Sequence, residues 1–186
     1  MNDPEYQNLT YQLLIRCFPQ VQVEKEWDAA KNSADSYGRT LYCPRLDIAV
    51  GPFNIDGNIE KNNLNINRSL AANGNFVQAL LNASEIPVSK NEYLQSLNEN
   101  PRCFLAIEIE KSGSRKHMLG DVVNASILGK IGLVIPMTES KRRGFLGIKK
   151  FIEFAMAVKK LKANLGQNVL IIRSERFLDV LNRAMC

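Results

Sequence analysis

The sequence predicts an α/β fold in which a mixed central β-sheet is flanked by helices. Three segments with strand periodicity come first, and apolar strands that alternate with helices follow from residue 103 onward. Hairpin-like links between the first three strands, followed by strand–helix–strand crossovers, indicate a mixed sheet with helices on both faces. Because 186 residues correspond to about one domain, we expect residues 1–186 to fold as a single unit.

The N-terminal part contains one predicted helix and two predicted strands. The helix covers residues 3–17, where Asp3 is a plausible N-cap and Pro4 occupies the first helical position. Alternating apolar and polar residues predict a strand over residues 21–27. A second strand, over residues 41–50, ends at a Gly-Pro pair.

Residues 54–100 differ from the rest of the chain, because twelve of these 47 residues are Asn. We expect this segment to be an Asn-rich helical insertion between the second and third strands. One helix is predicted around Phe76 and Leu80. Another begins at Ser89, because the spacing from Ser89 to Glu92 is that of a capping box.

The C-terminal half alternates between short apolar runs and amphipathic segments, which is typical of a sheet with helical crossovers. The predicted elements are a strand over 103–111, a helix over 114–128, a strand over 131–137, a helix over 145–165, a strand over 169–172 and a helix over 174–185.

Composition excludes several classes of protein. No run of 18 apolar residues is present, so we expect no membrane partner, and the absence of a signal-peptide pattern favours a cytoplasmic location. The four cysteines form no CxxC pair and the chain has one histidine, which argues against a zinc site. Neither a P-loop nor a GxGxxG motif occurs.

Acidic side chains interrupt two of the apolar strands. Glu108 and Glu110 are two residues apart in a strand, so both point to the same face of the sheet. Asp47 lies in the preceding strand, and the three carboxylates converge if these strands are neighbours. Clustered oxygen ligands of this kind suit Mg²⁺ or Mn²⁺. The alternative is that each acid lies at a strand end in water, paired with a nearby cation.

This arrangement resembles the PD-(D/E)XK nuclease superfamily, which has the restriction-endonuclease-like fold. The resemblance is carried by Pro44-Arg45-Leu46-Asp47, by Glu108-Ile109-Glu110, and by the helix and strand that follow. It implies a metal-dependent endonuclease that hydrolyses phosphodiester bonds in DNA, with Asp47, Glu108 and Glu110 as catalytic and metal-binding residues. The implied cofactor is Mg²⁺ or Mn²⁺, and a small single domain fits a restriction or defence role.

One departure from the family pattern concerns the catalytic cation. The family usually has Lys where this chain has Glu110, although some restriction enzymes carry Glu there. Lys116 or Lys130 could supply the missing charge. The additional acid that many family members carry on the first helix or strand would be one of Glu5, Glu24 and Glu26. The departure also favours an alternative function, a non-catalytic nucleic-acid-binding subunit on the same fold.

Charge is concentrated near the C-terminus. The chain has a net charge of +5, and residues 141–162 contain eight Lys or Arg and a single Glu. We therefore expect a polyanionic partner, namely DNA. The predicted nucleic-acid-binding residues are Lys141, Arg142, Arg143, Lys149, Lys150, Lys159 and Lys160. Asn side chains of the insertion, with Arg68 and Gln78, could contact base edges, and a homodimer would bring together two sites for cutting both strands.

Overall fold

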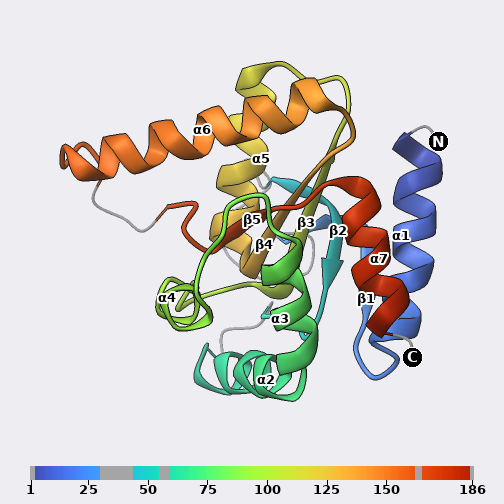
Figure 1. Cartoon of the computed structure of the whole chain (residues 1–186). Helices are drawn as coiled ribbons and strands as arrows, with labels where there is room; N and C mark the ends of the chain where they lie inside the picture. Colours follow the sequence, from blue (N-terminus) through green and yellow to red (C-terminus); the bar gives the residue numbers. More distant parts are fainter. Residues whose placement is uncertain (1–2, 30–43, 55–58, 162–164, 185–186) are drawn as a thin grey trace, which may run out of the picture.

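The computed structural model describes residues 3–29, 44–54, 59–161 and 165–184. It contains one mixed sheet with the strand order β1-β2-β3-β4-β5 (Figure 1). The strands are β1 (Val23–Asp28), β2 (Arg45–Val50), β3 (Cys103–Glu110), β4 (Gly129–Pro136) and β5 (Val169–Ile171). The first three are antiparallel neighbours, and β4 and β5 continue parallel to β3. The predicted α/β class with a mixed sheet is confirmed.

Helices cover both faces of the sheet (Figure 1). One face carries α5 (Arg115–Leu128) and α6 (Glu139–Ala157), and the other carries α1 (Asp3–Cys17) and α7 (Ser174–Ala184). Alternation along β3 divides the core accordingly. Ile107 packs toward α1 and α7, whereas Ala106 packs toward α5 and α6.

The helix α5 follows the sequence prediction closely. The Ser114 hydroxyl accepts a hydrogen bond from the N–H of His117, and the His117 side chain accepts one from the N–H of Ser114. This reciprocal capping fixes the start of the helix, and Gly129 caps its end. Its apolar residues at helical spacing are buried, and they are Met118, Val122, Ala125 and Leu128.

The helix α6 differs from the predicted range of 145–165. It begins at Glu139, because Thr138 caps it by accepting a hydrogen bond from the N–H of Lys141. It ends at Ala157, so Val158 is 45% exposed although the apolar period places it inward. The core-facing residues of the helix are Phe145, Ile148, Ile152 and Ala155.

Residues 59–100 form three helices that belong to the same hydrophobic core. They are α2 (Ile59–Ala72), α3 (Gly74–Ala83) and α4 (Lys90–Gln95). Ile66 and Phe76 are buried in the core that also contains α1 and α7. The capping box of Ser89 and Glu92 is confirmed. The helix α2 was not predicted, because its many Asn residues are poor helix formers.

Two further expectations concern the membrane and the cysteines. None of the helices in the described ranges is long and apolar enough to cross a bilayer. Cys17 and Cys103 are free thiols, whereas Cys43 and Cys186 lie outside the described residues.

Candidate functional site

The acidic residues gather where β2 and β3 stop pairing. The last pair in the ladder is Ile48 with Ile107. One residue further, the N–H of Asp47 donates to Glu108 Oε2 at 3.3 Å, and the N–H of Ile109 donates to Asp47 Oδ2 at 2.6 Å. At this point the backbone N–H groups of Asp47 and Ile109 donate to side-chain carboxylates and not to carbonyls of the neighbouring strand. Since residues opposite one another in a ladder share a face, Asp47 and Glu108 both project toward α5.

The helix α5 adds two polar side chains to these acids. Asn124 Nδ2 donates to Glu108 Oε1 at 3.3 Å. Asp121 Oδ2 is buried, and it accepts no hydrogen bond from any described residue. Asp121 was not among the predicted site residues, although its position three residues after Met118 and four before Ala125 places it on the buried face of the helix.

The electrostatics show that these acids influence one another. Glu108 is only 5% exposed, and burial, followed by the charges of Asp47 and Asp121, raises its pKa well above the usual range. Burial, followed by the charges of Glu110 and Asp47, raises the pKa of Asp121 to about 7. Four carboxyl groups therefore repel one another in a partly desolvated region.

Glu110 is held by the loop between β3 and α5. Its Oε1 accepts a hydrogen bond from the N–H of Gly113 at 2.5 Å. The loop approaches so closely that a Cβ at position 113 would lie 2.1 Å from Glu110 Oε2. Glycine at this position therefore leaves room for the carboxylate.

The helix α1 holds the backbone of Asp47 from the opposite face of the sheet. Gln7 Nε2 donates to the Asp47 carbonyl at 3.0 Å and to Glu26 Oε1 at 3.0 Å. Glu26 also forms an exposed ion pair with Arg45 at 3.8 Å. The other two candidates for an additional acid lie elsewhere, since Glu24 accepts a hydrogen bond from Gln22 and Glu5 is exposed on α1.

The four carboxyl groups do not form a ready-made metal site. Among the described residues, no group of three or more His, Cys, Asp or Glu side chains is arranged to hold a metal ion. Backbone and amide donors occupy oxygens of Asp47, Glu108 and Glu110. The donor chemistry nevertheless fits a hard divalent cation, which takes carboxylate oxygens. Binding would require these side chains to exchange hydrogen bonds for the ion.

The structure places neither candidate lysine against the acids. Lys130 lies at the start of β4, far along the strand from Val134, the partner of Glu108, and its Nζ donates to the Asn98 carbonyl at 3.0 Å. Lys116 is exposed in the first turn of α5. No described ion pair includes Glu108, Glu110 or Asp121.

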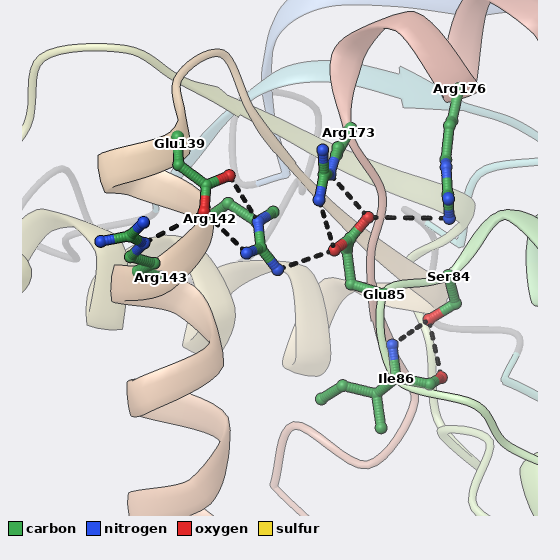
Figure 2. Close-up of polar contacts among 8 residues, drawn as sticks. All are labelled: Ser84, Glu85, Ile86, Glu139, Arg142, Arg143, Arg173 and Arg176. Carbon is green, nitrogen blue, oxygen red and sulfur yellow. Dashed lines mark hydrogen bonds and ion pairs between the residues drawn. The ribbon is translucent and has the colours of Figure 1, made fainter.

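Part of the predicted basic surface is engaged within the molecule. Figure 2 shows Arg142 between two acids, with Glu85 at 2.9 Å and Glu139 at 2.7 Å. Arg143 pairs with Glu139 at 3.0 Å but keeps 75% of its side chain exposed. Arg142 therefore joins α6 to the segment before α4 instead of facing solvent.

Two of the lysines also have internal partners. Lys141 Nζ donates to the Gly113 carbonyl. Lys149 Nζ donates to the carbonyls of Gly166 and Val169, and burial lowers its pKa to about 8. Of the predicted nucleic-acid-binding residues, the exposed ones are Arg143, Lys150, Lys159 and Lys160.

Several asparagines of residues 54–100 have structural partners. Asn62 Nδ2 donates to Asn54 Oδ1, and Asn54 Nδ2 donates to the Pro101 carbonyl. Asn98 Nδ2 lies within hydrogen-bond distance of the Gly129 carbonyl at 3.2 Å. These asparagines explain part of the unusual composition without a contact to bases.

Comparisons with protein-family models, with curated proteins and with solved structures found no match.

Proposed function

We propose that the chain is a divalent-metal-dependent hydrolase of phosphodiester bonds in DNA, whose site consists of Asp47, Glu108, Glu110 and Asp121. One observation carries the proposal. Two acids replace the ladder where β2 and β3 diverge, and they face a helix on which a third acid, Asp121, has a buried oxygen without a hydrogen-bond donor among the described residues.

A cation would relieve the unfavourable electrostatics of these residues. Glu108 and Asp121 have raised pKa values because burial and neighbouring carboxylates disfavour their charged forms. A divalent ion held by Asp47 and Glu108 would favour the charged forms of these carboxyl groups. When bound, Mg²⁺ or Mn²⁺ would lower the pKa of a water ligand and offset charge on the scissile phosphate.

The chain's own residues divide the remaining tasks. Asp47 and Glu108 would hold the cation, with Asn124 orienting Glu108 through its hydrogen bond. Glu110, fixed by Gly113, would position the attacking water. We assign to Asp121 Oδ2 the role of accepting the proton of that water, because this oxygen is buried and accepts no hydrogen bond from the described residues. This role replaces the lysine that the resemblance leads one to expect.

The order of elements supports the resemblance to PD-(D/E)XK nucleases. A helix, three antiparallel strands, a crossover helix and a parallel strand follow one another as α1, β1, β2, β3, α5 and β4, with the α2–α4 segment between β2 and β3. The acids stand in the second and third strands of this series, as the resemblance requires.

The test is cleavage of supercoiled plasmid and of single-stranded DNA in Mg²⁺ and in Mn²⁺. We expect cleavage by the wild type and by Glu60→Gln, an exposed control on α2. Glu108→Gln and Asp47→Asn should lose cleavage, because each removes a carboxylate from the site. Absence of cleavage by the wild type with either ion and either substrate would overturn the proposal, as would full activity of Glu108→Gln.

A second candidate is a non-catalytic nucleic-acid-binding subunit. It is favoured by the position of the lysines, since neither Lys116 nor Lys130 has a described contact with the acids. Under this alternative the protein binds DNA, does not cleave it, and gains no stability from Mn²⁺.

A further inference from the structure

A groove between α5 and α6 leads away from the candidate site. We propose that it binds the unpaired bases of single-stranded DNA, so that the substrate of the site has a single-stranded segment. This inference rests on the proposed function for the link to cleavage, whereas the binding itself can be measured without a metal ion.

The groove begins beside the acids. Two hollows of about 510 and 420 Å³ adjoin one another, and Arg115, Arg143 and Gly144 line both. The first hollow is also lined by Gly113, whose N–H holds the Glu110 carboxylate. A single DNA strand bound in the groove would therefore pass the loop that positions Glu110.

The second hollow is largely apolar and includes an exposed aromatic residue. Leu119, Ile148 and Phe151 line it, and Phe151 is 60% exposed. Phe154, one turn further along α6, is 64% exposed. Both rings are therefore exposed on the same helix. Unpaired bases stack on exposed aromatic side chains of this kind.

Two glycines of α6, Gly144 and Gly147, line the groove. A Cβ at Gly147 would meet no atom within 4 Å, so the side of the groove is empty at that point. A Cβ at Gly144 would lie 2.4 Å from Met118 Cε, which shows how closely α6 approaches α5 there.

The charges around the groove match a polyanion. Arg115, Lys116 and Arg143 line the apolar hollow, whereas the one acid that lines the adjoining hollow, Glu139, is paired with Arg143. Lys150 is exposed next to Phe151 in the chain, and Lys159 and Lys160 are exposed just after α6. A second copy of this chain would bring like charges together across the same surface. Bases of a duplex are stacked inside and cannot reach Phe151, so the occupant that combines phosphates with accessible bases is a single strand.

The test is fluorescence anisotropy with a labelled single-stranded DNA of about 16 nucleotides and with the matching blunt duplex, both in EDTA. We expect the wild type to bind the single strand more tightly. Phe151→Ala and Phe154→Ala should each weaken single-strand binding by about 5- to 100-fold, because each loses one stacked base. Neither should change the salt dependence, since no charge is removed.

Matched variants distinguish the contribution of the open groove to DNA binding from the contribution of the surrounding lysines. Gly147→Leu should block the groove, whereas Gly147→Ala adds only a methyl group to open space and should bind like the wild type. Lys116→Gln and Lys150→Gln should each reduce the log–log salt slope by about 0.7. The inference is overturned if the Phe151→Ala, Phe154→Ala double variant binds the single strand as the wild type does, or if the wild type prefers the duplex.

Two further measurements keep this inference distinct from the proposed function. Glu108→Gln should retain single-strand binding in EDTA while losing cleavage. If the wild type binds the single strand through Phe151 and never cleaves DNA, the proposed function fails and the groove assignment stands. If Phe151→Ala dissociates a dimer in sedimentation experiments and leaves DNA binding intact, the surface is an interface between copies and the assignment fails.

Discussion

At the scale of single residues, the molecule places carboxyl groups where they are unfavourable without a partner. Asp121 is the clearest case, because it shares a partly buried region with Asp47, Glu108 and Glu110 while its Oδ2 accepts no hydrogen bond from the described residues. Such an arrangement costs folding free energy, and carboxyl groups with strongly perturbed pKa values cluster at functional sites.

The cost of Asp121 can be measured through pH. Its pKa lies near 7 in the folded protein, above the usual 3.8, so the folded state binds a proton that the unfolded state releases. The metal-free wild type should therefore lose stability as pH rises from about 4 to about 7. Asp121→Asn should remove much of this loss and stabilise the protein at pH 8 by about 2–4 kcal/mol.

Thermal melts in EDTA across this pH range check the prediction. Asp179→Asn, at an exposed position on α7, is the matched control and should leave the pH profile unchanged. A profile of Asp121→Asn that parallels the wild type would show that this carboxyl is not destabilised.

Gly113 offers a test of how Glu110 is positioned. In Gly113→Ala the new methyl group would clash with the Glu110 carboxylate. The carboxylate would have to move, and it can do so because it is the end of a flexible side chain. We expect cleavage to fall at least about tenfold, since misplaced catalytic groups are costly, while the fold persists. Gly120→Ala, in open space on α5, should keep full activity. Equal activity of the two variants would remove Glu110 from the mechanism.

At the scale of elements, caps and apolar periods explain what the sequence made predictable. The strands β1 to β5, the stripe of α5 and the capping box at Ser89 follow from local patterns. The bounds of α6 do not follow from local patterns. Apolar residues continue its helical period beyond Ala157, and its first turns are polar and contain two glycines, which is not typical of a buried helix. Thr138 was the available signal for its start.

The cap of α6 gives a prediction at this scale. Thr138→Ala should lower the free energy of unfolding by about 1 kcal/mol, because the N–H of Lys141 loses its acceptor. Thr138→Ser keeps a hydroxyl and should be close to the wild type. Urea denaturation of the three proteins compares them, and equal midpoints would show that the cap contributes nothing.

The candidate site was only partly predictable for a related reason. Periodicity places Glu108 and Glu110 on one face, and neighbouring strands bring Asp47 to them. Helical spacing places Asp121 on the buried face of α5, but neither pattern indicates which turn of a later helix lies above the acids. The proximity of Asp121 and Asn124 to the acids therefore comes from tertiary packing. Likewise, the sequence records the charges of Arg142 and Lys149 but not their internal partners.

At the scale of the whole molecule, one buried acid connects distant parts of the chain. Glu85, with only 6% of its side chain exposed, pairs with Arg142 at the start of α6 and with Arg173 and Arg176 near the start of α7 (Figure 2). This cluster joins the segment before α4 to helices from both faces of the sheet.

Removing the Glu85 carboxylate should lower the stability of the whole fold. Glu85→Gln leaves three guanidinium groups without their shared carboxylate and should destabilise the protein by about 2–3 kcal/mol. Glu139→Gln, which removes a more exposed partner, should have a smaller effect. Chemical denaturation measures the free energy of unfolding of both variants. A loss for Glu85→Gln no larger than that for Glu139→Gln would contradict the proposed role of Glu85 in joining these segments.

The central claim is that Asp47, Glu108, Glu110 and Asp121 form a site for a divalent cation, and the most direct measurement is the melting temperature with and without Mn²⁺. A ligand at about 100 times its Kd adds about 2.7 kcal/mol of stability, which corresponds to a rise of about 5–10 °C for a chain of this size. We predict this rise for the wild type and for Glu60→Gln, and its loss in Glu108→Gln. A wild type whose melting temperature does not respond to Mn²⁺, or a Glu108→Gln variant that responds equally, would contradict the claim.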